Sequence, residues 1–181
     1  ALERGWVTRD RIRQVGEKLE AAHAQLHGAR LVVRAWVDPQ FCARLLTDAP
    51  AAAAELGIDT VNPNAPTQLA VVANDAATHN LIVCTLCSCY PAALLGPSPA
   101  WYKSRSYRAR AVRAPRRLLS AEFGLDVPAD VTVRVHDSTA DLRYLVLPAR
   151  PAGTDGWREE ELLPLVTRDT MLGVARPVVP P

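Results

Sequence analysis

Long apolar runs, lysine and excess charge are all scarce in this 181-residue chain. The sequence contains no run of about 18 apolar residues that would predict a membrane-spanning helix. It also shows no signal-peptide pattern, in which a charged stretch is followed by an apolar one. Lys18 and Lys103 are the only lysines among 21 basic residues, and the formal net charge of +2 is too small to indicate nucleic-acid binding. We therefore expect a cytoplasmic protein that binds neither membranes nor nucleic acid.

The composition is that of a folded globular protein. Hydrophobic residues make up 49% of the chain and charged residues 22%, and the length suits one domain of ordinary size. Fifteen prolines against nine glycines indicate stiff connections. We expect an N-terminal helical segment over 1–28, a main domain over 29–176 and a proline-rich tail over 177–181.

Residue patterns predict a mixture of helices and strands. Helices are expected from Thr8 to about 27, ended by Gly28, and at about 39–46, 51–56, 100–112, 115–123 and 158–166. Strands are expected at 31–36, 68–73, 80–83, 131–136 and 144–147, with a turn at 74–75 and a proline-interrupted loop at 90–99. This order predicts an α+β fold, layered αββα with the helices outside, in which a strand leads directly into Cys84.

Three of the four cysteines fall within six residues, Cys84-Thr85-Leu86-Cys87-Ser88-Cys89, called here the cysteine segment. Disulfides are unusual in a reducing compartment, so this spacing predicts metal ligands or redox groups. Thiolates bind zinc, copper(I) and iron–sulfur clusters. Cys42 stands apart and is interpreted as a small buried apolar side chain.

Two kinds of metal site remain open on spacing alone. A tetrahedral zinc site, or a cubane cluster, needs a fourth ligand, which Cys42, His79 or His136 would have to supply. Alternatively, the sulfurs of Cys87 and Cys89 and the backbone nitrogens of Ser88 and Cys89 can surround a metal in one plane, with Cys84 as an axial sulfur. That arrangement needs trivalent cobalt or iron and leaves a sixth position open for catalysis. Spacing by itself favours the structural site.

The flanking sequence favours the second kind of site. The cysteine segment resembles the metal-binding signature of the nitrile hydratase α subunit and of the related thiocyanate hydrolase subunit. The resemblance covers about residues 30–175. It continues in residues 36–39 (WVDP), 101–103 (WYK), 107–110 (YRAR), 113–116 (RAPR) and 146–157 (VLPARPAGTDGW).

The resemblance implies a non-corrin cobalt(III) centre in a metal-binding catalytic domain, with Cys84, Cys87, Ser88 and Cys89 as metal ligands. Thr85 indicates cobalt, and iron is less expected. By the same resemblance, Cys87 is expected to be oxidised to the sulfinate and Cys89 to the sulfenate. Cys89, Cys87 and Ser88 form the expected catalytic centre of a hydro-lyase that hydrates a nitrile to an amide, with the Cys89 sulfenate as nucleophile or base.

The same resemblance implies partner chains. A β-type subunit, or a β and a γ chain, would cover the metal and donate arginines to the oxidised sulfurs, and a maturation or activator protein would load it. The isolated chain is then weakly active. Two departures from the family pattern stand out, because Ala92 replaces a frequent aromatic residue and Ala65 a frequent glutamine. Ala92 predicts room for a bulky nitrile, such as a heteroaromatic or nucleoside one. Both changes also fit a thiocyanate hydrolase.

Three alternatives are kept beside this interpretation. A zinc-stabilised binding module could use the arginine-rich stretch 105–117 to contact a partner or nucleic acid, although a solvated or subunit-facing helix is expected there. A metal carrier could shuttle cobalt to another protein. His23 and His27 lie one helical turn apart, but they lack a nearby third ligand and are expected to be a surface pair.

Overall fold

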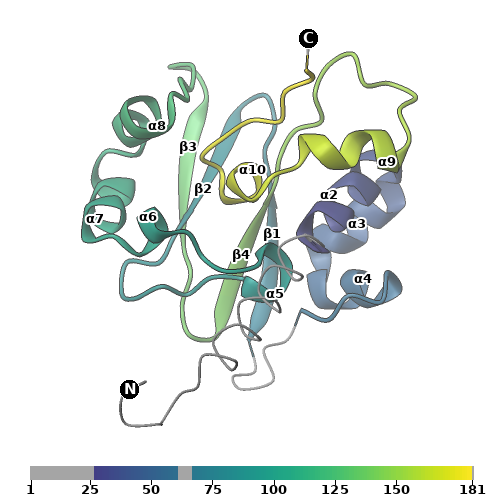
Figure 1. The fold of residues 1–181 in the computed structure, drawn as a ribbon, viewed down its shortest axis with the longest axis horizontal. Helices are drawn as coiled ribbons and strands as arrows, with labels where there is room; N and C mark the ends of the chain where they lie inside the picture. Colours follow the sequence, from purple (N-terminus) through teal and green to yellow (C-terminus); the bar gives the residue numbers. More distant parts are fainter. Residues whose placement is uncertain (1–26, 61–66, 181) are drawn as a thin grey trace, which may run out of the picture.

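The computed structural model describes residues 27–60 and 67–180, and at its centre four strands form two parallel pairs (Figure 1). β1 (Gln68–Ala73) pairs with β4 (Leu142–Leu147), and β2 (Thr78–Val83) pairs with β3 (Thr132–Asp137). The strand predictions for these four segments are confirmed. β1 and β2 are joined by the predicted turn, but each pairs with a strand more than 50 positions away.

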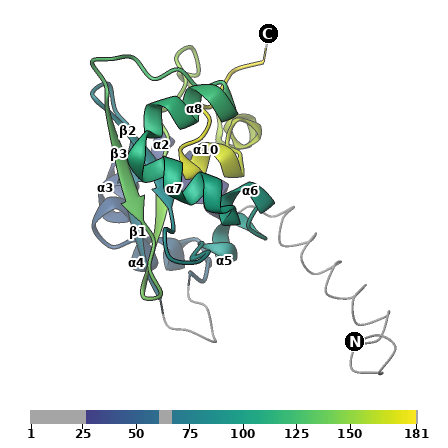
Figure 2. The same ribbon diagram turned by 90° about the vertical axis from the view of Figure 1, so that its left-hand side faces the viewer.

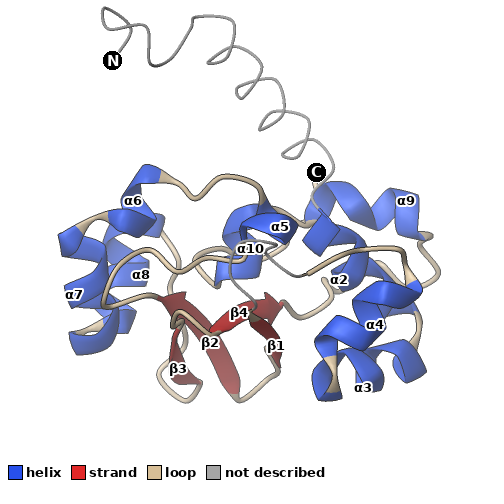
Figure 3. Ribbon diagram, turned by 90° about the horizontal axis from the view of Figure 1, so that it is seen from below, coloured by secondary structure: helices blue, strands red, loops and turns tan. Residues whose placement is uncertain are grey.

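Helices lie on both outer sides of the strands, which gives the expected αββα layering (Figure 3). α3 and α4 contact β1, whereas α7 contacts β2 and α8 contacts β3. Figure 2 looks at the molecule from the second side and shows α7 and α8 in front of β2 and β3. The helices are α2 (His27–Val37), α3 (Pro39–Thr47), α4 (Ala49–Glu55), α5 (Ala92–Leu95), α6 (Ala100–Lys103), α7 (Arg105–Arg113), α8 (Pro115–Phe123), α9 (Glu159–Leu162) and α10 (Arg168–Leu172).

The predicted strand at 31–36 is wrong, because these residues form most of α2. Leu31, Val32 and Val33 have no exposed surface, whereas Arg30 is exposed, so α2 buries one wide face and presents the other to solvent. A short continuous apolar run does not distinguish a buried helix from a buried strand. Packing against α3, α5 and α9 overrides the strand preference of valine.

Gly28 lies inside α2 and does not end a helix there, so that expectation is also wrong. A Cβ at this position would lie 2.8 Å from Met171 Sδ and 3.0 Å from Leu95 Cδ2. Gly28 therefore allows α2 to approach α5 and α10 closely. The expected helix from Thr8, most of the segment 1–28 and the pairing of His23 with His27 lie outside the described residues.

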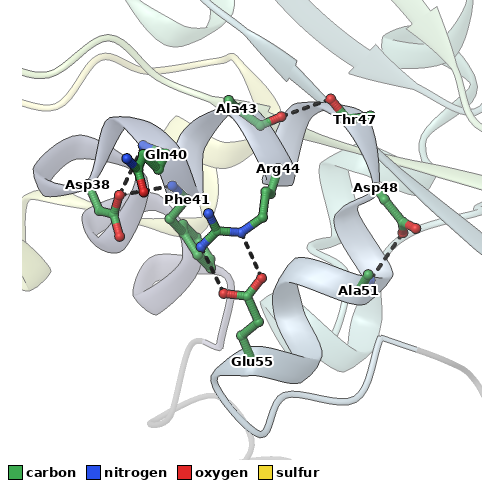
Figure 4. A network of polar contacts seen from close by, with 9 residues as sticks. All are labelled: Asp38, Gln40, Phe41, Ala43, Arg44, Thr47, Asp48, Ala51 and Glu55. Carbon is green, nitrogen blue, oxygen red and sulfur yellow. Dashed lines mark hydrogen bonds and ion pairs between the residues drawn. The ribbon is translucent and has the colours of Figure 1, made fainter.

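The two helices predicted directly after Trp36, at about 39–46 and 51–56, are confirmed, and single residues determine where they begin. The Asp38 carboxylate accepts hydrogen bonds from the backbone N–H groups at the start of α3, and Asp48 does the same for α4 (Figure 4). Arg44 of α3 forms a two-bond ion pair with Glu55 of α4, with N···O distances of 2.8 and 2.9 Å. These contacts fix the corner that packs on β1.

The later helices are more divided than their sequence predicts. The helix expected at 100–112 is split at Ser104, whose side chain caps α7, and the one at 158–166 becomes α9 followed by a 3₁₀ turn that contains Pro164. α5 lies within the expected loop at 90–99. α10 was not expected, although Thr167 and Thr170 form a capping box at its start. Among the described helices, none has the length and apolarity needed to cross a membrane.

A buried polar network joins the strands to the end of α10. His79 Nε2–H donates to the Gly173 carbonyl at 2.8 Å, and the Asn74 carboxamide oxygen accepts from the backbone and side-chain nitrogens of Asn80. Asn80 Oδ1 in turn accepts from His136 Nε2–H at 2.8 Å. These bonds satisfy polar groups that burial would otherwise penalise, and they fix β2 in place.

Gly173 should therefore tolerate no side chain. Its φ is +80°, and an added Cβ would lie 1.9 Å from the Asn80 carbonyl oxygen in β2. Gly173→Ala combines left-handed backbone strain with a backbone clash, so we expect a loss of unfolding free energy above about 3 kcal/mol. Chemical denaturation measures it.

Gly124→Ala is the matched control, because Gly124 also ends a helix at positive φ but has no atom within 4 Å of the added Cβ. We expect it to lose only about 1 kcal/mol. Equal losses in the two variants would contradict the packing described here.

Candidate metal centre

The cysteine segment begins where β2 ends. Cys84 follows Val83 directly and has no exposed surface, whereas Cys87 is exposed and Cys89 is half-buried. One sulfur of the segment thus lies inside the protein, and the other two lie at or near its surface. This matches the expected loop after a strand.

The first turn of the segment is held by Asp137. The β2–β3 register places Asp137 beside Val83, and its carboxylate accepts the Thr85 backbone N–H at 2.8 Å and the Thr85 hydroxyl. The backbone N–H of Ser138, the next residue, donates to the Val83 carbonyl at 2.7 Å. The end of β3 therefore sets the direction in which the chain leaves β2.

The three sulfurs converge. Cys84 Sγ lies 3.5 Å from Cys87 Sγ, and Cys87 Sγ lies 3.2 Å from Cys89 Sγ. All three lie within 4.8 Å of one another. The backbone N–H groups of Ser88 and Cys89 are directed at Cys87 Sγ. One short loop thus brings together the three sulfurs that are predicted as ligands, and the same loop carries the backbone nitrogens of Ser88 and Cys89.

The donor set fits a six-coordinate metal better than a tetrahedral one. For a metal–sulfur distance of about 2.3 Å, two sulfurs at a right angle lie about 3.3 Å apart and two at the tetrahedral angle about 3.8 Å. The observed separations of 3.5 and 3.2 Å are nearer the first value. Thiolates alone also suit zinc or copper(I). Backbone amide nitrogens must lose their protons to bind a metal, which requires a strongly Lewis-acidic ion such as trivalent cobalt or iron.

The candidates for a fourth tetrahedral ligand are not in the cluster. Among the described residues, only Cys84, Cys87 and Cys89 gather as potential metal-binding side chains. His79 and His136 make the hydrogen bonds given above, and Cys42 of α3 packs against the hydrophobic core but is only partly buried, not fully buried as predicted. The described structure therefore lacks the side chain that a tetrahedral zinc site would need.

The two outer cysteines differ in acidity. Hydrogen bonds from the Cys89 thiol and from the backbone N–H groups of Ser88 and Cys89 lower the pKa of Cys87 to about 7. Burial, and donation of its proton toward Cys87, raise the pKa of Cys89 to about 12, while the positive charge of Arg143 acts in the opposite direction. Cys87 is thus the exposed, acidic thiol of the cluster.

Residues that sequence reasoning did not select also hold the segment. Arg108 of α7 donates to the carbonyl oxygens of Thr85 and Leu86 at 3.3 and 3.0 Å, and Tyr102 of α6 donates to the Cys89 carbonyl at 2.8 Å. Arg110 pairs with Glu122, and Arg116 donates to three carbonyls before β3. Three of the six arginines at 105–117 therefore have partners within the chain. Their spacing along the sequence does not distinguish them from the other three.

Comparison with known proteins identifies the chain's relatives. The family model described as "Nitrile hydratase, alpha chain" matches residues 1–175. The chain is 48% identical over 178 residues to the high-molecular weight cobalt-containing nitrile hydratase subunit alpha of Rhodococcus rhodochrous, covering 98% of this chain and 86% of that one. It is 47% identical over 161 residues to thiocyanate hydrolase subunit gamma of Thiobacillus thioparus, covering 84% and 65% respectively.

A solved structure shows the same fold. A double mutant of the Fe-type nitrile hydratase from Comamonas testosteroni Ni1 superposes with a TM-score of 0.88 at 41% identity, covering 99% of this chain and 88% of that one. Likeness of fold thus extends to an enzyme of the iron type.

The low pKa of Cys87 predicts that its thiol is the first of the four to react with an alkylating reagent. In the reduced, metal-free chain, iodoacetamide should alkylate Cys87 first, because only the thiolate reacts and its pKa is about 7. We expect the rate at Cys87 to rise through about pH 7 and then level off. Peptide mass spectrometry after timed quenching measures it.

Cys42 is the internal control, since burial raises the pKa of its thiol. At pH 7 we expect Cys87 to react at least about tenfold faster than Cys42. A rate at Cys87 that rises only near the ordinary thiol pKa of 9.0 would contradict the hydrogen bonding described here.

Proposed function

The chain belongs to the nitrile hydratase α-chain family, and we propose that it is the metal-binding subunit of a cobalt nitrile hydratase that accepts bulky nitriles. The observation that carries this proposal is the convergence of three sulfurs and two backbone amides on one loop. The described residues offer no fourth side chain for a tetrahedral site, which disfavours the zinc-stabilised binding module.

Cys84, Cys87 and Cys89 would bind the metal through sulfur, and Ser88 and Cys89 through backbone nitrogen. Thr85 follows the first cysteine, as in the family's cobalt members, and the similar Rhodococcus subunit is named cobalt-containing. Bound cobalt(III) would supply a Lewis acid that polarises a nitrile or a water molecule. Because octahedral cobalt(III) exchanges ligands slowly, this assignment also favours a resident metal over a metal carrier.

The outer cysteines supply the reacting groups of the chain itself. We propose that Cys87 is oxidised to the sulfinate and Cys89 to the sulfenate, with dioxygen as the oxidant. The Cys89 sulfenate oxygen would either take a proton from the water that attacks the nitrile carbon, or bond to that carbon itself and then be displaced from it by water, which restores the sulfenate. Overall, the water oxygen bonds to carbon and both of its protons reach nitrogen, which gives the amide.

A cavity lined by residues that follow the cysteine segment supports the bulky substrate. It has a volume of about 330 Å³ and is lined by Tyr90, Pro91 and Ala92, by Leu69 of β1 and by Arg143, whose charge acts on Cys89. A volume of this size accommodates a small organic ligand. Ala92 leaves open the space that an aromatic residue would fill, so we propose heteroaromatic or nucleoside-like nitriles as substrates.

A partner chain is needed to complete this site. Cys87 is exposed, and the Leu86 side chain next to it is 87% exposed. A single exposed apolar side chain is ordinary on a protein surface, so the stronger support for a partner is that the similar proteins are named as subunits. We propose that a β-type subunit, or a β and a γ chain, covers the loop after a maturation protein has loaded it, and that the isolated chain is weakly active.

Thiocyanate hydrolysis is the second candidate function. It is supported by the 47% identity to a thiocyanate hydrolase subunit, nearly the same as the identity to the nitrile hydratase relative. Thiocyanate is far smaller than the cavity beside Ala92. Cavity size therefore favours the nitrile, and assays of both compounds with the same preparation distinguish the two functions.

Oxidation of the cysteine segment is testable directly. We expect the peptide from the mature complex to carry two added oxygen atoms on Cys87, one on Cys89 and none on Cys84, because only the outer thiols are accessible. Tandem mass spectrometry locates them, and protein from cells grown without cobalt is the control. Unmodified thiols in a complex that hydrates nitriles would overturn the assigned oxidation.

Substrate size tests the role of Ala92. In the complex, Ala92→Trp should lower kcat/KM for 3-cyanopyridine by at least about tenfold while changing that for acetonitrile much less, since it fills the cavity. Ala92→Ser is the control that keeps the cavity open. Wild-type protein that strongly prefers acetonitrile would contradict the bulky-substrate proposal.

A further inference from the structure

One short stretch of chain supplies three side chains that hold the backbone of the cysteine segment and of the strand before it. Tyr107 Oη donates to the Ile82 carbonyl in β2 at 2.6 Å, and Arg108 Nη1 donates to the carbonyls of Thr85 and Leu86. Tyr102 Oη donates to the Cys89 carbonyl at 2.8 Å. These three residues are called here the carbonyl clamp. Tyr107 holds the strand before the cysteine segment, Arg108 holds the middle of the segment, and Tyr102 holds its end.

The clamp itself is rigid. The side chains of Tyr102 and Tyr107 have no exposed surface, and the ring of Trp101 lies edge-on to both, with centroids 5.9 and 4.8 Å away. Ser104 accepts the Tyr107 backbone N–H at 3.0 Å and so fixes the start of α7. Packing therefore determines where the two hydroxyl groups lie.

The cysteine segment has little packing of its own. Its Thr85, Leu86, Cys87 and Ser88 are exposed, so apolar contacts do not hold the turn. Among the described residues, the Tyr102 hydroxyl makes the one hydrogen bond from outside the segment to the backbone of Cys87, Ser88 or Cys89. Hydrogen bonds must therefore determine how the outer donors lie.

Arg108 also acts on the donors through a peptide group. Its guanidinium polarises the Leu86 carbonyl, and the N–H of the same peptide, that of Cys87, donates to Cys84 Sγ at 3.2 Å. Polarising one end of a peptide strengthens the hydrogen bond at its other end. Arg108 thereby favours the approach of Cys87 to Cys84.

We propose that Tyr102, Tyr107 and Arg108 are positioning residues that arrange the cysteine donors for the metal. This inference rests on the proposed function and extends it to residues that touch neither metal nor substrate. Tyr102 should matter most, because it alone holds the outer donors. Tyr107 should matter least, because Ile82 is already held by pairing of β2 with β3.

The test compares Tyr102→Phe with Thr154→Val in the complex with the partner chain. Thr154 is the control for metal binding, since it is also fully buried but its hydroxyl donates to the Pro151 carbonyl at 2.7 Å, outside the cysteine segment and the cavity. Cobalt per chain, the sulfur-to-cobalt charge-transfer absorption and the rate of cobalt loss to a chelator are measured, with the unfolding temperature of each variant.

We expect Tyr102→Phe to shift the charge-transfer band and to release cobalt about five- to tenfold faster, as for the loss of one hydrogen bond. Thr154→Val should change neither while lowering the unfolding temperature by a similar amount. Equal behaviour of the two variants would overturn the clamp. Wild-type protein without cobalt would instead overturn the proposed function.

Arg108 supplies a second test on the protein surface, which keeps the proposal falsifiable if Tyr102→Phe does not fold. Arg108→Gln removes the charge and should speed cobalt loss, and Arg108→Lys, which retains a cationic donor, should restore part of the wild-type rate. Wild-type rates in both Arg108 variants would overturn its assigned role.

Discussion

The pairing of β2 with β3 is the constraint on which the candidate site depends. Its register places Asp137 beside Val83, and the Asp137 carboxylate then binds Thr85 as the chain leaves the sheet. Cys84 is held inside the protein as a consequence, and the next five residues must turn across the surface above it. The Cys87 backbone N–H donates to Cys84 Sγ at 3.2 Å, and this turn brings the three sulfurs together.

The rest of the fold supports this pairing from two sides. α7 and α8 cover β2 and β3, and the hydroxyl groups of Tyr102 and Tyr107 fix the loop and the strand before it. From the opposite end, the network of His79 and Asn80 ties β2 to the carbonyl of Gly173. The loop with the cysteines is therefore exposed, but β2, which leads into it, is buried along nearly its whole length.

Sequence reasoning located the site because its chemistry is local. Three thiols in six residues after a β-branched run indicate candidate metal ligands at a strand end. Asp38, Asp48 and Gly124 are helix boundaries that follow from single residues. The missed features are not local. α2 contains consecutive buried valines that fit a strand equally well, and the contacts of Asp137, Arg108 and Tyr102 join residues 13–52 positions apart. The parallel pairing that brings these residues to the cysteine segment has no signature in the sequence.

The identity of the bound metal tests the account most directly. Cells that express the chain with its partner would be grown with cobalt and zinc both available, and elemental mass spectrometry would count the metals in the purified complex. The account predicts about one cobalt per chain, because sulfur and amide donors in this arrangement suit a trivalent, six-coordinate ion. Zinc in stoichiometric amount without cobalt would contradict it, and the cysteine segment would then be a structural site.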